Sequence, residues 1–298
     1  MLSKSDIEFY RENGYLLVED VVDPALLDEM NRVTAELIEA SREVAESNDI
    51  YDLDEGHSRE RPKLTRIKLP TKQHPVFARA LKESRIPDVL RNLMGPDVAL
   101  QTSKLNTKAP GGGAAVEWHQ DWAFYPYTND NLLACGLMLE DVGLENGPLM
   151  VIPGSHRGPI LSHHNGDGLF CGAIDPDDPD FHMDRAVTLT GRAGSMTVHH
   201  VRALHGSAPN MSDRARKILF YECHAADAWP LMGSGSYIQT QGQEKIWADF
   251  LERMIIGNPT ITPRIESAPV RLPLPPAPVG GSIFKTQKSG GARSAFAA

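Results

Sequence analysis

The sequence predicts an α+β fold in which helices on the N-terminal side pack on an antiparallel barrel of two sheets. A change of pattern along the 298 residues supports this prediction. In the first part of the chain, apolar residues recur at intervals of three and four, which is the period of a surface helix. After the Gly95-Pro96-Asp97 turn, short alternating or apolar runs are separated by Gly, Pro and Asn, as is typical of an antiparallel barrel or sandwich. Hydrophobic residues at 41% and charged residues at 23% are ordinary values for a globular protein with a buried core.

The first expected elements are a short helix, a strand and a long helix. Ser5-Asp6-Ile7-Glu8 forms a capping-box pattern that begins the first helix, and Asn13-Gly14 ends it. A strand is expected over Tyr15–Val22. From Asp23-Pro24 the helical period resumes, and we expect this helix to continue to about Glu46.

The middle of the chain begins with a polar stretch. Ser47–Lys63 has no period and is expected to be a mobile loop, for which a substrate lid is one role. Two helices are then expected, over His74–Glu83 and Ile86–Met94. The pattern beyond them predicts strands over Val98–Lys108, Ala115–Trp118, Leu132–Leu139, Leu149–Ile152, Ala186–Leu189, Ser195–Val201 and Lys217–His224.

These elements are interpreted as one domain over residues 1–261. It comprises the N-terminal helices (1–96), the barrel core (97–225) and a late helix (244–256). Residues 262–298 form a tail rich in Pro, Gly and Ser, which we expect to be extended or disordered.

Composition argues against several classes of protein. The formal net charge is -9, and no basic stretch interleaved with aromatic residues occurs, so we expect no nucleic-acid partner. No run of about 18 apolar residues and no apolar leader are present, so we expect a cytoplasmic protein without a membrane partner. The three widely spaced cysteines, Cys135, Cys171 and Cys223, are expected to be buried free thiols.

The most informative tripeptide is His119-Gln120-Asp121. In a strand, residues i and i+2 point to the same face, so one imidazole and one carboxylate would enter the barrel together. Two histidines and one carboxylate form a facial triad that suits iron(II), because they leave three positions open for a bidentate 2-oxo acid and dioxygen. The tripeptide alone is a weak signal, since a surface histidine beside an acid is common.

A third ligand is available in the segment His199-His200-Val201-Arg202-Ala203-Leu204-His205. Strand alternation would put His199 and His200 on opposite faces, so at most one of them looks inward. His199, His200 and His205 therefore remain alternatives on the pattern alone.

The segment from His205-Gly206-Ser207 to Arg214-Ala215-Arg216 resembles the distal motif of the phytanoyl-CoA dioxygenase family. FYRENGYLLV at residues 9–18 is similar to the family's opening helix and strand, and residues 145–156, ENGPLMVIPGSH, are similar to its turn motif. The resemblance extends over about residues 5–224. It implies a double-stranded β-helix (jelly-roll, cupin-like barrel) with flanking N-terminal helices, and an Fe(II)- and 2-oxoglutarate-dependent dioxygenase acting with O2 on a small-molecule substrate.

The resemblance also implies roles for single residues. His205 would be the second iron histidine, giving the metal and catalytic set His119, Asp121 and His205. Arg216, eleven residues after His205, would bind the distal carboxylate of 2-oxoglutarate with help from Ser207, and a guanidinium fork suits that task. Arg214 is the rival, in a charged turn where a solvated side chain is the ordinary outcome.

Weaker candidates lie on the strand before the HxD tripeptide. Thr102, Lys104, Asn106 and Lys108 alternate there, and related enzymes place co-substrate or substrate contacts on this strand, so Lys104 and Asn106 are taken as cofactor-binding candidates. An exposed lysine on an edge strand is the plain alternative. Gly136 stands where the family often has a tryptophan, so the packing around the co-substrate is expected to differ.

Other residues are assigned with less specificity. We interpret His156 as fixing a turn. Trp118, Trp122, Phe124 and Tyr125 would form either an apolar substrate wall or core packing. Arg59, Arg61, Lys63 and Arg66 near the polar loop would suit the phosphates of an acyl-CoA, although charged loops are usually just solvated.

Asp121 bears on the type of reaction, because iron halogenases have a small residue there to make room for chloride. Hydroxylation or a related oxidation is therefore expected. Two alternatives remain: a cupin-like metalloenzyme that does not use 2-oxoglutarate, and a catalytically silent binding module of the same fold. The substrate and the oligomeric state are not determined by the sequence.

Overall fold

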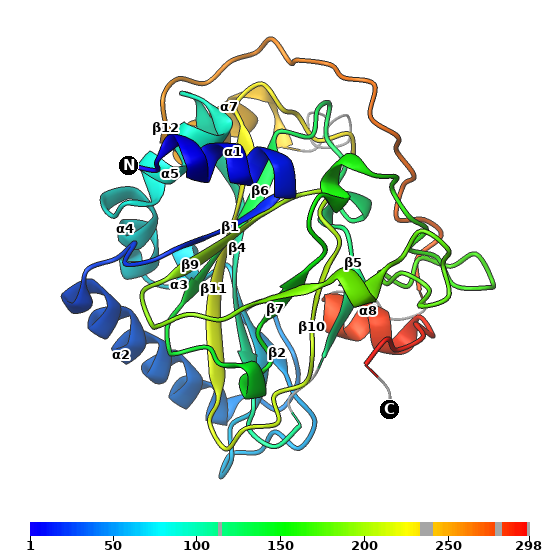
Figure 1. The fold of residues 1–298 in the computed structure, drawn as a ribbon. Coiled ribbons are helices and arrows are strands. Elements are labelled where there is room, and N and C mark those ends of the chain that lie inside the picture. Colours follow the sequence, from blue (N-terminus) through cyan, green and yellow to red (C-terminus); the bar gives the residue numbers. More distant parts are fainter. Residues whose placement is uncertain (113–114, 233–240, 278–281, 297–298) are drawn as a thin grey trace.

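Two antiparallel sheets form the centre of the molecule in the computed structural model, which describes residues 1–112, 115–232, 241–277 and 282–296 (Figure 1). In these residues, eight strands form a large sheet and four form a small one. The large sheet has the order β1 (Tyr15–Val18), β9 (Met196–His200), β6 (Leu132–Met138), β11 (Arg216–Ala225), β4 (Val98–Lys108), β3 (Leu64–Lys68) and β2 (Tyr51–Leu53), with β12 (Met254–Ile256) paired to β4. The small sheet has the order β5 (Val116–His119), β10 (His205–Ser207), β7 (Leu149–Val151) and β8 (Val187–Leu189).

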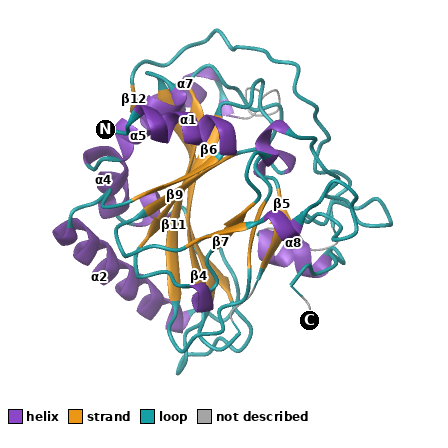
Figure 2. Cartoon of the chain, in the orientation of Figure 1, coloured by secondary structure: helices purple, strands orange, loops and turns teal. Residues whose placement is uncertain are grey.

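Helices of the N-terminal part cover one face of the large sheet (Figures 1 and 2). Their apolar sides share one core with every second residue of the sheet, including Leu105 of β4, Leu137 of β6 and Tyr221 of β11. The Tyr221 hydroxyl donates a hydrogen bond of 2.6 Å to the Phe77 carbonyl, which ties β11 to the helical layer. The N-terminal helices are α1 (Lys4–Asn13), α2 (Pro24–Ala40), α3 (Pro70–Gln73), α4 (Pro75–Glu83) and α5 (Ile86–Met94), and the described residues later in the chain add α7 (Gln243–Arg253) and α8 (Ile283–Ser289).

The opposite face of the large sheet looks toward the small sheet. Because successive side chains on a strand alternate, the neighbours of the helix-facing residues point into the space between the sheets. Ala134, Ile218 and Phe220 belong to a separate apolar cluster on this face. Lys104 and Asn106 of β4 line a pocket here. The fold therefore places the main apolar core on one side of the large sheet, and both apolar and polar side chains on the other.

The N-terminal elements differ in detail from the predictions. The first helix begins at Lys4, because Ser3 rather than Ser5 is its N-cap: the Ser3 Oγ accepts from the Asp6 amide at 3.1 Å, and the Asp6 carboxylate accepts from the Ser3 amide at 2.9 Å. The strand after it is shorter than predicted and ends at Val18. The long helix ends at Ala40 instead of about Glu46, with a single 3-10 turn after it.

The polar stretch Ser47–Lys63 is not wholly a loop, so that prediction was wrong in part. Tyr51–Leu53 forms β2 and pairs with β3 at the edge of the large sheet. Its Asp52 side chain is buried and forms an ion pair of 3.0 Å with Lys68. The predicted late helix also ends earlier, at Arg253, and Met254–Ile256 continue as β12 against β4.

The C-terminal tail contains a helix, which contradicts the expectation that it is wholly extended or disordered. Residues 283–289 form α8, capped by the Ser282 hydroxyl, and α8 lies against β5 (Figure 1). The buried Gln287 side chain anchors it: Gln287 accepts from the Glu117 amide at 3.0 Å and donates to the Gly172 carbonyl at 2.8 Å. These contacts hold the helix against the small sheet without an extensive apolar face.

The strands predicted after residue 97 are all present. The predicted limits of the strand over Val98–Lys108 are confirmed, and each of the others differs by one residue at one or both ends. All three cysteines are buried and free. No helix in the described ranges combines the length and the apolar character needed to cross a bilayer.

We predict that Leu105→Ala lowers the free energy of unfolding by about 2–5 kcal/mol, because Leu105 is completely buried beneath the helices and its removal leaves a cavity. Urea denaturation measures the change. Leu144→Ala is the matched control, since this leucine is 75% exposed, and it should change stability by less than about 0.5 kcal/mol. Equal losses in the two variants would contradict the described packing.

Candidate metal centre

The pairing of β5 with β10 brings two of the predicted ligands together. His119 ends β5 and His205 begins β10, and the two residues are direct partners across the ladder. Their ring centroids are 4.1 Å apart. Asp121 lies two residues after the end of β5, in a 3-10 turn over Asp121–Ala123. Strand alternation was expected to direct His119 and Asp121 to the same face, but the strand ends at His119 and the following turn directs the Asp121 carboxylate toward both imidazoles.

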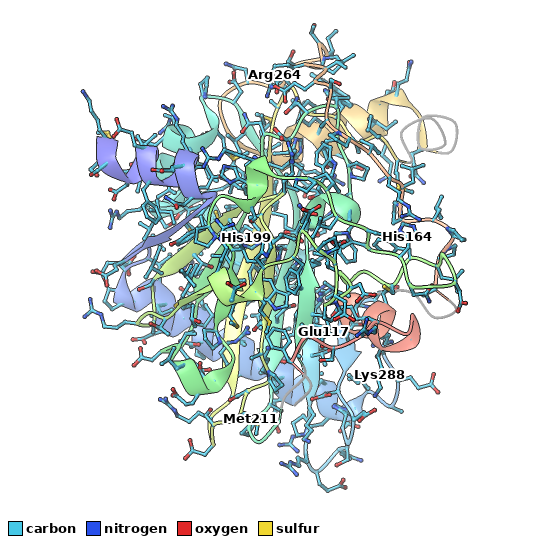
Figure 3. The ribbon with its side chains drawn as sticks, turned by 45° about the vertical axis from the view of Figure 1, so that its right-hand side comes forward. Glu117, His164, His199, Met211, Arg264 and Lys288 are labelled. Atoms are coloured by element: carbon cyan, nitrogen blue, oxygen red, sulfur yellow. The ribbon has the colours of Figure 1, made fainter. Side chains whose placement is uncertain are left out.

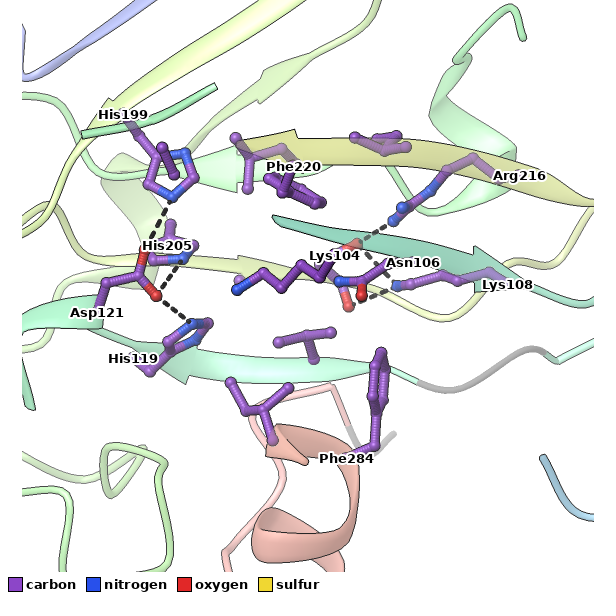
Figure 4. Close-up of a pocket in the computed structure, with 17 residues that line it drawn as sticks. Lys104, Asn106, Lys108, His119, Asp121, His199, His205, Arg216, Phe220 and Phe284 are labelled. Atoms are coloured by element: carbon purple, nitrogen blue, oxygen red, sulfur yellow. Dashed lines mark hydrogen bonds and ion pairs between the residues drawn. The ribbon is translucent and has the colours of Figure 1, made fainter. Parts of the chain in front are cut away.

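His119, Asp121 and His205 present one ligand atom each within 4.8 Å of one another, and all three are buried (Figure 4). His119 Nε2 lies 3.6 Å from Asp121 Oδ1, and His205 Nε2 lies 3.9 Å from the same oxygen. Two nitrogens and one oxygen that converge from one side form the donor set predicted for a facial triad.

The orientation of both rings is set by the backbone. His119 Nδ1 lies 2.8 Å from the Glu117 carbonyl, and His205 Nδ1 lies 2.9 Å from the Ala203 carbonyl. A carbonyl accepts only, so each Nδ1 carries the proton and each Nε2 keeps its lone pair toward Asp121. This arrangement fixes the tautomer that a metal ligand needs.

Electrostatics favour the same protonation states. Burial, together with repulsion by His119 and His199, lowers the pKa of His205 well below its usual value, so the imidazole is neutral. Burial alone would raise the pKa of Asp121, but the surrounding side chains of His205, His119 and His199 hold that pKa well below its usual range, so the carboxylate is ionised. A neutral imidazole beside a carboxylate is the state that binds a divalent metal.

The three histidines that competed for the distal role are now separated. His199 does point inward, and its Nε2 lies 3.3 Å from Asp121 Oδ2, the oxygen that does not face the triad. His200 lies on the opposite face, with its ring 5.2 Å from that of His156. His199 thus contacts the second oxygen of the Asp121 carboxylate, a contact that strand alternation allowed but did not predict.

At the far end of the same pocket lie Arg216 and Lys108 (Figure 4), and the Ser207 hydroxyl contacts both. Ser207 Oγ accepts from Lys108 Nζ at 2.7 Å and from Arg216 Nη2 at 3.0 Å, and donates to the Gly147 carbonyl at 2.8 Å. The Gly147 carbonyl also accepts from Arg216 Nε at 3.1 Å. Gly147 has a φ of 75°, and a side chain there would meet the Ala208 carbonyl and Lys108.

Two cations are therefore buried side by side. In the described part of the chain, neither Lys108 nor Arg216 has a carboxylate within ion-pair distance. Burial lowers the pKa of Arg216 to about 10. Burial and the charge of Arg216 lower the pKa of Lys108 well below its usual value. Lys108 Nζ also donates to the Ser207 and Ala208 carbonyls, so its three donors are all used. Within the described residues, the donor of the pair that has no acceptor is Arg216 Nη1. Two buried positive charges next to each other still favour an anion beside them.

Lys104 and Asn106 line the pocket between its two ends (Figure 4). Lys104 forms an ion pair with Glu222 of the neighbouring strand, and its Nζ lies 5.7 Å from the centre of the Phe220 ring. Asn106 Oδ1 accepts from Arg66 Nε at 3.1 Å. Gly136 permits this packing, because a side chain at that position would come within 2.9 Å of the Phe220 ring.

The C-terminal helix closes one side of the pocket. Ile283 and Phe284 of α8 line it, together with residues from both sheets. Figure 3 shows Glu117 on β5 beside α8, near the Lys288 end of the helix, and this is the region where Gln287 is bonded to the Glu117 backbone. The sequence did not identify Ile283 and Phe284 as pocket residues, because apolar residues in this part of the tail do not recur with the period of a helix.

The remaining predicted residues fall into groups. Arg214 is exposed and pairs with Glu145 at 3.3 Å, as expected of the rival in the charged turn. His156 is buried, with Nε2 3.2 Å from the Arg11 carbonyl, which agrees with a turn-fixing role. Trp118 and Trp122 are buried in apolar clusters, whereas Phe124 and Tyr125 line a second cavity beside Asp121.

We predict that His199→Ala weakens iron(II) binding by about 10- to 100-fold, because removing a partner of a ligating carboxylate typically costs that much. Anaerobic titration with iron(II) measures the affinity. His200→Ala is the matched control on the opposite face of the same strand, and it should leave the affinity unchanged. An effect of the same size in both variants would show that His199 does not act through Asp121.

Comparison with known proteins supports the same interpretation. The model of the family "Phytanoyl-CoA dioxygenase (PhyH)" matches residues 10–218. A probable alpha-ketoglutarate-dependent hypophosphite dioxygenase of Stutzerimonas stutzeri is 34% identical over 283 residues, covering 94% of this chain and 95% of the relative. The peroxisomal phytanoyl-CoA dioxygenase of Rattus norvegicus is 26% identical over 269 residues, covering 85% of this chain and 75% of the relative.

The chain is also similar in fold to solved structures of 2-oxoglutarate-dependent oxygenases. A crystal structure of EctD from S. alaskensis with 2-oxoglutarate and 5-hydroxyectoine superposes with a TM-score of 0.63 at 26% identity, covering 76% of this chain and 77% of that chain. The family match spans most of the chain and includes His119, Asp121, His205 and Arg216. The chain therefore belongs to the phytanoyl-CoA dioxygenase family of iron(II)- and 2-oxoglutarate-dependent oxygenases.

Proposed function

We propose that this family member is a non-haem iron(II), 2-oxoglutarate-dependent dioxygenase in which His119, Asp121 and His205 hold the metal. One observation carries the proposal: a single pocket has a three-donor face at one end and two buried cations without a carboxylate partner at the other. A 2-oxo acid with a second carboxylate matches both ends.

The donor set suits iron(II). Two imidazoles with their Nε2 atoms directed inward and one ionised carboxylate are the ligands of the facial triad that leaves three coordination positions open. When bound, iron supplies the activation of dioxygen, while the protein supplies orientation and a site from which water is excluded. Asp121 occupies the position where a halide would otherwise bind, which favours hydroxylation or a related oxidation.

Arg216, Ser207 and Lys108 are proposed to hold the distal carboxylate of 2-oxoglutarate. Arg216 is already oriented by the Gly147 carbonyl, and Lys108 by Ser207, so few side chains need to be ordered when the anion binds. The burial of both cations strengthens each charge-assisted hydrogen bond. Lys104 and Asn106 are proposed to contact the middle of the co-substrate.

Overall, one oxygen atom of O2 would enter the substrate and the other would enter succinate, as 2-oxoglutarate loses CO2. The S. stutzeri relative is named for hypophosphite, which makes that ion the first substrate to test.

We further propose that the two antiparallel sheets form the double-stranded β-helix, or jelly-roll, of cupin-like barrels. We also propose that residues 1–261 fold as one domain and that the protein is cytoplasmic.

We predict that Arg216→Ala raises the KM for 2-oxoglutarate by about 10- to 100-fold, because it removes charge-assisted hydrogen bonds from a buried carboxylate. Arg214→Ala, two residues away on the surface, is the control and should leave KM unchanged. Arg216→Lys, which keeps the charge but not the fork, should lie between them. Succinate formation measures all three.

The same Arg216 and Arg214 variants distinguish the proposed dioxygenase from the two alternative functions. A cupin-like metalloenzyme without 2-oxoglutarate would lose no activity in Arg216→Ala, and a silent binding module would not form succinate in any variant. Either result would contradict the proposal.

We predict that the affinity for 2-oxoglutarate falls as the pH rises through the lowered pKa of Lys108. Burial favours the neutral amine in the folded protein, whereas a bound carboxylate favours the ammonium, so binding takes up a proton above that pKa. Calorimetry at about pH 7 and about pH 9 would measure the loss. Lys108→Met should bind more weakly at both values and show a smaller pH dependence, and an unchanged slope in this variant would assign the titration elsewhere.

A further inference from the structure

A second cavity lies next to the proposed metal centre. It has a volume of about 380 Å³, near the lower end of the range of about 300–1,000 Å³ usual for ligand pockets. Asp121 and Lys104 line it, so it adjoins the co-substrate pocket, which the same two residues also line. A molecule in this cavity would lie on the Asp121 side of the metal.

Arg66 is the distinctive cation of this cavity. Its Nε donates to Asn106 Oδ1 at 3.1 Å, and its guanidinium carbon lies 5.6 Å from the centre of the Phe284 ring. Within the described ranges, its Nη1 and Nη2 groups have no hydrogen-bond or ion-pair partner. The side chain is thus held in place by its inner nitrogen and the ring, while its outer donors remain available.

The other charges that line the cavity are largely matched with one another. Lys104 pairs with Glu222, and Lys68 pairs with Asp52 at 3.0 Å. Asp49 is exposed at the rim, and Asp121 belongs to the metal site. Burial lowers the pKa of Arg66, and the nearby charges of Asp52, Glu222 and Asp121 offset this only in part. Among the described cations that line the cavity, Arg66 is therefore the one without a carboxylate in ion-pair contact.

We propose that this cavity is the substrate site and that Arg66 there binds a small oxyanion, a phosphorus oxyanion or a short carboxylate. The proposal rests on the function proposed above. A guanidinium with two unused nitrogens suits two oxygens on one phosphorus or carbon atom. Tyr125, whose pKa is raised by burial and by the nearby charges of Asp121 and Glu222, completes the wall on the metal side together with Phe124. A cavity with this polar lining does not suit a long acyl chain.

The reaction that follows balances without a further reagent. One oxygen of O2 enters a P–H or C–H bond of the oxyanion, giving P–OH or C–OH, and the other enters succinate. Reduction of O2 takes four electrons: two come from the oxidised substrate bond and two from the decarboxylation of 2-oxoglutarate. With hypophosphite, the product is phosphite.

The polar loop cations named in the sequence analysis do not share this position. Arg59 is exposed and pairs with Glu43 at 3.0 Å, and Arg61 is also exposed. Arg66 alone among those cations lines this cavity. Arg61→Met is therefore a matched control for Arg66→Met, because it removes the same charge at a site away from the cavity.

The test uses the full chain with iron(II) and 2-oxoglutarate. Under anaerobic conditions, the visible charge-transfer band of the metal-bound co-substrate is recorded while hypophosphite, propanoate or uncharged propanamide is added. We expect at least one oxyanion, and not propanamide, to shift the band and, in air, to stimulate succinate formation. The product distinguishes the two sources: phosphite from hypophosphite, or a hydroxy acid from propanoate.

Arg66→Met should keep the band and weaken oxyanion binding by about ten-fold or more, the effect of losing a charge-assisted hydrogen bond. Arg66→Lys should lose less, and Arg61→Met should match the unmodified protein. If the band forms but neither oxyanion shifts it, or if Arg66→Met binds the oxyanion normally, the substrate proposal is wrong. If the band never forms, the proposed function itself fails.

Discussion

The antiparallel pairing of β10 with β5 is the interaction on which the candidate site depends. It makes His119 and His205 direct partners in the ladder, so the distance between the two imidazoles is set by strand geometry and not by flexible loops. Gly206 permits the close approach, because a side chain there would lie 3.2 Å from the Trp118 ring. The backbone carbonyls of Glu117 and Ala203 then orient both rings, so the same short ladder provides spacing, direction and tautomer.

Successive side chains along the large sheet point to opposite faces, so the residues that stabilise the core lie on one face and the residues that line the pocket lie on the other. On β4, Leu105 lies in the core under the helices, while its neighbours Lys104 and Asn106 line the pocket on the other face. Charged side chains can therefore be enclosed without disturbing the apolar core, and a change in one layer need not affect the other. The helical layer also holds the sheet rigid beneath the site, as a preorganised site requires.

Much of this arrangement could be predicted from the sequence, because it depends on local patterns. Alternation gave the limits of β4, and the family motif selected His205 and Arg216. What could not be predicted depends on distant contacts. Lys108 differs from Lys104 only in its position along β4, and it joins Arg216 because Ser207, from the other sheet, lies between them. The helix α8 has no amphipathic period, and hydrogen bonds from Gln287 to distant backbone groups hold it.

The place of α8 in the chain has a consequence for the order of assembly. The three proposed metal ligands, the small sheet and every strand of the large sheet except β12 are complete by residue 225, whereas Ile283 and Phe284 come from a helix later in the sequence. A growing chain can thus form an open donor face first, accessible to an ion from bulk water, and receive its last wall afterwards. Loading of the metal and enclosure of the pocket are separate events in such a chain, and the second would retain what the first has bound.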